Sequence, residues 1–220
     1  MRFRGLKALL WVGLISPSFY ANAEINPSRY VSTHQQTQSK IHEALGQSID
    51  VKEKYQLEKA QTWLSYADQL YSEKSQPKNL EMVYQQALKI TNTDNREQFA
   101  TQTPILPFAQ VMRRDLWARI ESIKVHAGFQ CAYKVLAQAE VKLVWGAAEY
   151  CQLGWRHSRE IFASAERLVD QAGYLAQHCE NDHYLDQAFS PVKFATLEQL
   201  NGVKGCEGVN PVYWPLTPNQ

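Results

Sequence analysis

The part of this sequence with the most obvious chemical potential is the run His178-Cys179-Glu180-Asn181-Asp182-His183. Two imidazoles and two carboxylates within six residues could supply nitrogen and oxygen ligands to a metal ion. Cys179, however, is expected in a disulfide, and a histidine near the predicted end of a helix is also favourable through the helix dipole alone. We therefore favour a solvent-exposed loop over a metal site, and we predict no bound metal or cofactor.

Short catalytic motifs are missing from the chain. There is no Gly-x-Ser-x-Gly elbow, no glycine-rich phosphate loop and no His-Glu-x-x-His pair. We therefore predict that the protein is not an enzyme. A catalytic group assembled only in space would leave no such motif. The alternative is accordingly a small-ligand-binding protein or an enzyme with a pocket between its helices.

Three residues are candidate binding contacts. Trp155 and Arg156 follow Gly154 in a predicted turn between helices, and both residue types are frequent at binding hot spots. Tyr71, on the apolar stripe of an earlier predicted helix, is the third. For Trp155 we favour a simpler interpretation, in which its ring packs over the turn and Ser158 caps the following helix.

Four cysteines, all in the second half of the chain, indicate two disulfides in an oxidising compartment. If one helix carries both Cys131 and Cys151, these residues lie about 30 Å apart, well beyond the ~7 Å between Cα atoms that a disulfide allows. The next helix should return antiparallel and bring Cys179 beside Cys131. The predicted bonds are therefore Cys131–Cys179 and Cys151–Cys206. Redox catalysis is not expected, because no Cys-x-x-Cys motif is present.

The first residues predict export. A basic start is followed by a short apolar stretch, Ala8 to Ile15, and then by the small-x-small pattern Ala21-Asn22-Ala23. This stretch is far shorter than the ~20 apolar residues needed to span a bilayer. We predict a signal peptide over residues 1–23 that is cleaved before Glu24. The expected location is the periplasm, with secretion as the alternative.

Charge and hydropathy exclude further classes of protein. Removing Arg2, Arg4 and Lys7 from the 23 basic residues leaves 20 against 22 acidic ones. Nucleic acid is not an expected partner, because its binding depends on clustered lysine and arginine. After signal cleavage no apolar run is long enough to cross a membrane, and Lys142 interrupts the densest one.

The composition between residues 24 and 200 predicts one all-α domain. Long stretches rich in Gln, Ala, Leu, Glu and Lys favour helix, and no alternating pattern typical of strands appears. Helix breaks are expected near Gly46, at Gln76-Pro77, from 92 to 107, and at Gly128, Gly154 and 179–182. Ser190-Pro191 predicts the start of a last helix, and residues 201–220 an irregular tail on the surface.

Two segments of the domain, at about residues 51–92 and 129–177, share a pattern that indicates duplicated helix hairpins. Apolar and small residues recur at helical steps of three and four, 79 residues apart in the first helix and 78 in the second. In the first helix the pairs are Leu57/Leu136, Ala60/Ala139, Leu64/Leu143, Tyr66/Trp145, Ala67/Gly146 and Tyr71/Tyr150; in the second they are Val83/Ile161, Tyr84/Phe162, Ala87/Ala165 and Ile90/Leu168. Chance similarity between amphipathic helices is the alternative.

The hairpins resemble degenerate tetratricopeptide units. The matching positions are Leu64, Ala67, Tyr71, Leu80, Tyr84 and Ala87. The chain departs from the pattern at Asp68, where a small residue is usual, and at Asn92, where a proline is usual. The resemblance implies two helix hairpins with connecting helices.

Three further stretches, 115–119, 128–131 and 139–145, resemble uncharacterised helical periplasmic regions of outer-membrane-protein-A-like envelope proteins. They read Asp-Leu-Trp-Ala-Arg, Gly-Phe-Gln-Cys and Ala-Glu-Val-Lys-Leu-Val-Trp. This resemblance implies a role in the cell envelope and no catalytic residues. We therefore expect an exported, non-enzymatic helical interaction or scaffold module whose partner is an envelope protein.

Overall fold

The chain folds as an all-α protein in a computed structural model that describes residues 27–92, 103–180, 189–202 and 205–218. The predicted signal peptide and its cleavage site lie outside these ranges. The helices are α1 (Pro27–Gln47), α2 (Val51–Ser72), α3 (Pro77–Thr91), α4 (Arg114–Lys124), α5 (Phe129–Leu153), α6 (Trp155–Gln177) and α7 (Leu197–Leu200), and two short strands are β1 (Val192–Lys193) and β2 (Thr217–Pro218). No helix in the described ranges is both long and apolar enough to cross a bilayer.

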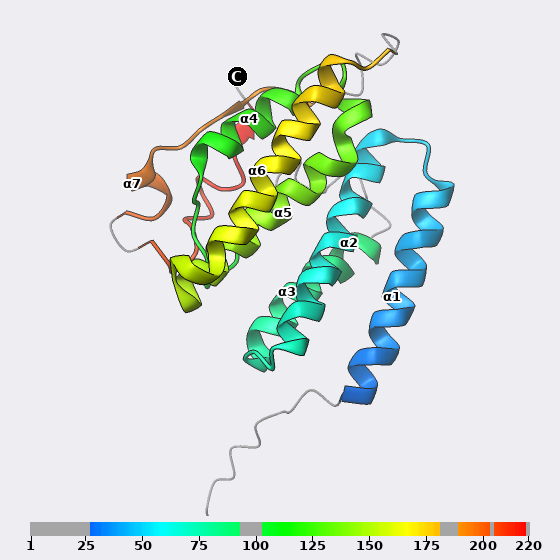
Figure 1. Ribbon diagram of the computed structural model, residues 1–220, viewed down its shortest axis with the longest axis vertical. Coiled ribbons are helices and arrows are strands. Elements are labelled where there is room, and N and C mark those ends of the chain that lie inside the picture. Colours follow the sequence, from blue (N-terminus) through cyan, green and yellow to red (C-terminus); the bar gives the residue numbers. More distant parts are fainter. Residues whose placement is uncertain (1–26, 93–102, 181–188, 203–204, 219–220) are drawn as a thin grey trace, which may run out of the picture.

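The helices lie side by side in sequence-related groups (Figure 1). Helix α1 occupies one edge, the α2–α3 hairpin lies next to it, and the α5–α6 hairpin follows. Helix α4 and the C-terminal segment cover the far side of the α5–α6 hairpin. Helices α2 and α5 pack against each other at the centre, and both end at the lower side of the view.

Local sequence signals explain most helix boundaries. The Asp50 side chain caps α2 by accepting hydrogen bonds from the backbone N–H groups of Lys52 and Glu53. Helix α3 begins with Pro77, whose missing N–H costs nothing in a first turn. Gly154 separates α5 from α6 in a single residue, because its φ of 81° is a conformation that other residues rarely adopt.

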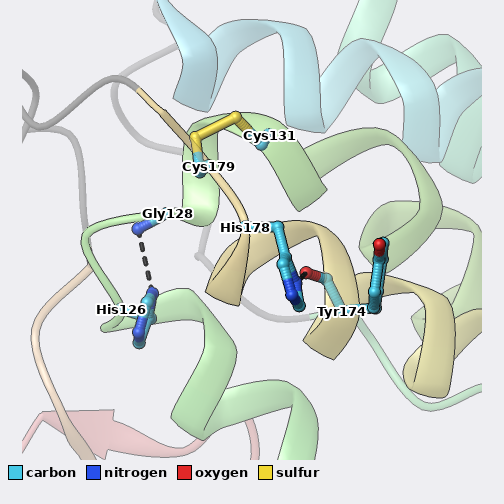
Figure 2. Close-up of a disulfide and its surroundings, with 6 residues drawn as sticks. All are labelled: His126, Gly128, Cys131, Tyr174, His178 and Cys179. Carbon is cyan, nitrogen blue, oxygen red and sulfur yellow. Dashed lines mark hydrogen bonds between the residues drawn. A yellow bond between two sulfur atoms is a disulfide. The ribbon is translucent and has the colours of Figure 1, made fainter.

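Both predicted disulfides are confirmed. Cys131 and Cys179 join the start of α5 to the end of α6, with Cα atoms 5.8 Å apart (Figure 2). Cys151 and Cys206 join the end of α5 to the C-terminal segment, at 5.5 Å. Beside the first bond, a Cβ atom on Gly128 would lie 1.9 Å from the Ala176 carbonyl oxygen, so only glycine permits this close approach of backbones.

Two positions of the predicted duplication make aromatic contacts in the structure. Tyr66 of α2 and Trp145 of α5, which correspond in the predicted duplication, stack on each other with ring centroids 4.7 Å apart. Gly146 lies where α5 crosses α6, and an added Cβ there would be 3.0 Å from the Phe162 ring. Small residues therefore occur at this crossing as expected. The duplication and its tetratricopeptide-like pairing stay predictions.

A cluster of buried charges joins three helices. The Lys59 ammonium of α2 lies 2.5 Å from a Glu140 carboxylate oxygen of α5, and Lys124 of α4 lies 2.6 Å from both Glu140 and Glu121. Thr103 donates to Glu140 at 2.6 Å. Since two lysines balance two glutamates, the cluster is neutral overall, and its hydrogen-bond geometry specifies how α2, α4 and α5 meet.

The C-terminal segment differs from the prediction in two respects. Ser190-Pro191 does not start a helix: strand β1 follows it directly and pairs antiparallel with β2. The last helix, α7, begins only after Thr196, whose capping box with Gln199 provides the stronger start signal. The tail is also not confined to the surface, because Trp214 is buried and its indole donates to the Thr103 carbonyl at 2.9 Å.

Candidate functional site

The tips of the two hairpins lie at the same end of the molecule. The turn between α2 and α3 and the turn between α5 and α6 are both at the lower side of Figure 1. Asn79, in the first turn of α3, donates a hydrogen bond of 3.4 Å to Gln152 near the end of α5. The contact between Tyr66 and Trp145 lies between the same two helices, so these tips are held in a defined relative position.

The α5–α6 tip exposes large apolar side chains. Tyr150 is 37% exposed, Leu153 54% and Trp155 55%. We call these three residues the tip surface. They are exposed because Gly154 ends α5 and allows α6 to begin at once, so no loop folds back over them. The disulfide at Cys151 lies within the tip surface and ties it to the C-terminal segment. The arrangement is therefore an apolar surface on a rigid support.

Two of the three candidate binding residues lie at this tip. Trp155 and Arg156 open α6, and Arg156 is exposed. The Trp155 ring stacks on Phe162 at 6.0 Å but remains more than half exposed. The expectation that Ser158 caps this helix is wrong, because α6 begins three residues earlier and Ser158 is fully buried inside it.

The third candidate, Tyr71, lies in a different contact. Its ring stacks on Tyr30 of α1 with centroids 4.3 Å apart. Tyr30 also donates to Asp68 of α2 at 3.1 Å, and His34 of α1 lies 2.9 Å from the same carboxylate. Tyr71 is thus part of the attachment of α1 to the α2–α3 hairpin, and it is only half-buried there.

A largely buried carboxylate directly precedes the tip surface in the sequence. Glu149, in the last turns of α5, is only 6% exposed. Burial raises the pKa of its carboxyl group and the neighbouring Glu73 raises it further, whereas the Trp145 indole and His157 act in the opposite direction. Among the described residues, no lysine or arginine forms an ion pair with it.

Two aromatic side chains near this carboxylate, Tyr66 and Trp145, have buried polar atoms without a hydrogen-bond partner. The Tyr66 ring lies between Trp63 and Trp145, and its hydroxyl is buried without a hydrogen-bond partner among the described residues. The Trp145 indole N–H also has no partner with hydrogen-bond geometry. It lies close enough to Glu149, however, to lower the pKa of that carboxyl group and so favour the ionised carboxylate. Burial, Glu149 and Glu73 raise the pKa of the Tyr66 hydroxyl, so it stays protonated.

This group of side chains can accept hydrogen bonds from a cationic donor. Two carboxylates and a phenol oxygen offer acceptors, and the charge on the carboxylates favours a positive partner. Within the described ranges, no three His, Cys, Asp or Glu side chains are grouped so as to hold a metal ion.

The histidine-rich run considered for metal binding is only partly described. His178 directs Nδ1 to the Tyr174 carbonyl oxygen at 2.8 Å, and its ring stacks on the Tyr174 ring, as Figure 2 shows beside the disulfide. Cys179 is in the disulfide with Cys131. The remaining residues of the run, from 181 onward, lie outside the described residues.

Sequence reasoning did not identify Glu149 or its neighbours. The one available signal was the pairing of Tyr66 with Trp145 in the predicted duplication. It could not show that these two rings touch, nor that Glu149 faces them. Comparison of the chain with protein-family models, curated proteins and solved structures gave no match.

Proposed function

We propose that this chain is an exported, non-enzymatic helical interaction module of the bacterial cell envelope. The observation that carries the proposal is the tip surface, where Tyr150, Leu153 and Trp155 are exposed on a support braced by a disulfide. Exposed aromatic and aliphatic side chains that are held rigidly lose little conformational entropy on binding. The two disulfides favour an oxidising compartment such as the periplasm.

The proposed partner is another envelope protein that presents an apolar segment to this tip. Trp155 is suited to anchor such a segment, because the residue is 55% exposed while Phe162 stacks on its ring. A helix or an extended strand could lay two or three apolar side chains over the tip surface. Arg156, exposed at the edge, would contact the partner's polar rim.

Catalysis receives less support from the structure. The strongest concentration of charged groups, formed by Lys59, Lys124, Glu121 and Glu140, is closed to solvent, and its members pair with one another. Such a cluster has no group free to act on a substrate. A ligand pocket between the helices thus stays the alternative to an interaction module.

The experiment is quantitative capture from cross-linked cell envelopes with the mature chain and two variants. Leu153→Ser combined with Trp155→Ser removes the apolar character of the tip surface. Tyr174→Ser is the matched control, because Tyr174 is 62% exposed on the same helix but near its opposite end. Helical content and thermal stability of all three proteins are compared by circular dichroism.

We expect the wild type and the Tyr174→Ser variant to retain the same envelope protein in similar amounts. The tip variant should retain at least about tenfold less, since loss of a hot-spot residue costs about 2 kcal/mol or more. Equal retention by all three proteins, or no protein retained by the wild type, would contradict the proposal.

A further inference from the structure

We propose that the Cys131–Cys179 disulfide is a redox-modification site, open to reversible reduction by a dithiol such as that of Cys-x-x-Cys proteins. In this reaction the chain is the substrate of thiol–disulfide exchange and not its catalyst. The inference goes beyond the proposed function, because it concerns the end of the α5–α6 hairpin opposite to the tip surface (Figure 2).

The first argument is the access to this bond. Cysteine is among the residue types most often buried in proteins, yet Cys131 is exposed. In the described stretch of α5 from Phe129 to Glu149, the one other exposed residue is Lys134. Residues three apart lie on the same side of a helix. Solvent therefore reaches this stretch of α5 chiefly at Cys131 and at the lysine next to it.

The second disulfide is less accessible. Cys151 and Cys206 are both half-buried, and the Gln110 side chain donates a hydrogen bond of 3.4 Å to the Cys206 sulfur. Exposed disulfides are reduced more readily than covered ones, because an attacking thiolate must reach a sulfur atom. The two bonds of this chain therefore differ in access, and the second provides an internal reference for the first.

The charges around the first bond favour its reduction. Cys131 is the third residue of α5, where the helix dipole stabilises a thiolate, and Lys134 adds a positive charge although it also pairs with Glu58 at 3.5 Å. Cys179 follows the C-terminus of α6, where the dipole has the opposite sign, and Glu180 is its neighbour. A thiolate is therefore more stable on Cys131 than on Cys179.

This difference decides the course of the exchange. Both cysteines have exposed surface, so the better leaving group determines which sulfur is displaced. One thiolate of the dithiol bonds to the Cys179 sulfur, the Cys131–Cys179 bond breaks, and its electron pair leaves with Cys131 as a thiolate. The second thiol of the dithiol, after losing its proton, attacks the mixed disulfide and releases Cys179. The dithiol is thereby oxidised by two electrons to a disulfide, and its two protons become available to the two cysteines.

The packing around the bond is suited to survive its reduction. Phe129 and Ala132 at the start of α5 are buried, as are Ala172 and Ala176 towards the end of α6. The Ala176 carbonyl also lies against Gly128, where no Cβ atom would fit. These contacts hold the two helix ends together without the disulfide, so the two thiols stay close enough to form the bond again.

The test follows both disulfides in one sample of the oxidised mature chain. Dithiothreitol is the dithiol, aliquots are alkylated with iodoacetamide at intervals, and the modified cysteines are mapped by mass spectrometry. Circular dichroism is recorded on the chain in which only one bond is reduced, before and after the dithiol is removed in air. Limiting iodoacetamide then compares Cys131 with Cys179 at pH 7. The variants are Lys134→Gln and, as an exposed control on α1 at the far edge of the molecule, Lys40→Gln (Figure 1).

We expect Cys131–Cys179 to be reduced at least about tenfold faster than Cys151–Cys206. The singly reduced chain should keep its helical signal and form the bond again. In this chain Cys131 should be alkylated at least about threefold faster than Cys179, because the thiolate is the reactive form. Lys134→Gln should reduce this preference, and Lys40→Gln should leave it unchanged.

Three results would overturn the inference. Reduction of Cys151–Cys206 at the same rate or faster would contradict the argument from access. Loss of the helical signal on reduction of the first bond would show that the bond is structural and not a reversible site. Equal alkylation of Cys131 and Cys179 would contradict the assignment of Cys131 as the leaving group. None of these results bears on capture by the tip surface, which is measured separately.

Discussion

Replacing Glu140 by glutamine tests whether the buried charges hold the helices together. The Glu140 carboxylate touches both buried ammonium groups, at 2.5 Å from Lys59 and 2.6 Å from Lys124, and it accepts a hydrogen bond from Thr103. Glutamine has nearly the same shape. The substitution therefore changes the charge of the cluster from zero to +1 without opening a cavity.

The expected loss of stability follows from the burial of these groups. Lys59 and Lys124 have almost no exposed side-chain surface, and removing one partner from a buried pair costs about 3–5 kcal/mol. Glu121 still neutralises Lys124 at 2.6 Å, so the lower end of this range applies. For a chain of this size, a loss of about 3 kcal/mol lowers Tm by about 6–12 °C.

Urea unfolding followed by tryptophan fluorescence, with the disulfides intact, measures the loss. The control is Asp170→Asn, which breaks an ion pair with Arg119 in which both side chains are about half exposed. Such surface pairs contribute less than about 1 kcal/mol. If Glu140→Gln costs no more than this control, the argument that the buried cluster specifies the helix packing is wrong.

The same substitution should change the response to acid. Burial alone would raise the pKa of Glu140, but Lys124 and Lys59 outweigh it and hold the pKa well below the ordinary value of 4.5. The ionised carboxylate therefore stabilises the fold above pH 4.5, and this contribution is lost as the pH falls through the lowered pKa. The wild type should lose stability in this acidic range, and the glutamine variant should lose less.

Three further predictions concern other contacts. Glu149→Gln should raise the free energy of unfolding at pH 7, measured in urea. The sign follows because the pKa of Glu149 in the folded state is raised above its ordinary value of 4.5, so the ionised carboxylate weakens the fold at any pH above that value. An unchanged free energy of unfolding in the variant would contradict this reasoning. Cys151→Ser should cost about 2–4 kcal/mol in the same assay, whereas an unaltered midpoint would mean that the disulfide adds nothing to the folded state. Asp68→Asn should weaken the attachment of α1, where Tyr30 and His34 both contact this carboxylate, by about 1–2 kcal/mol. Hydrogen exchange should then accelerate in α1 and not in α5, and equal acceleration throughout would indicate global destabilisation instead.

The disulfide pairing is the part of the tertiary structure that the sequence predicted best. An uninterrupted helix from before Cys131 to beyond Cys151 separates these two residues along a rigid rod. A short turn at Gly154 then forces the next helix to return. Local rules were sufficient here, because helix length and chain reversal alone decide which cysteines can meet.

Local rules failed where a long-range contact competed with them. Ser190-Pro191 has the composition of a helix start, yet β1 forms there because the C-terminal β2 pairs with it, Val192 opposite Pro218 and Lys193 opposite Thr217. The start of α6 at Trp155 rather than Ser158 follows from the glycine turn, which lets the helix begin without a side-chain cap.

The sequence by itself determined the helical class, most helix boundaries and the pairing of the cysteines, since each depends on residues that are close along the chain or joined by one rigid helix. Tertiary structure alone decided which charges are buried. Lys59 and Glu149 are charged residues, which are mostly found at the surface of proteins. Packing of α2 against α5 buries both, and it supplies Lys59 with Glu140 as a partner while leaving Glu149 without one. Burial and pairing depend on three-dimensional neighbours that are far apart in the sequence, so no local pattern distinguishes these two residues.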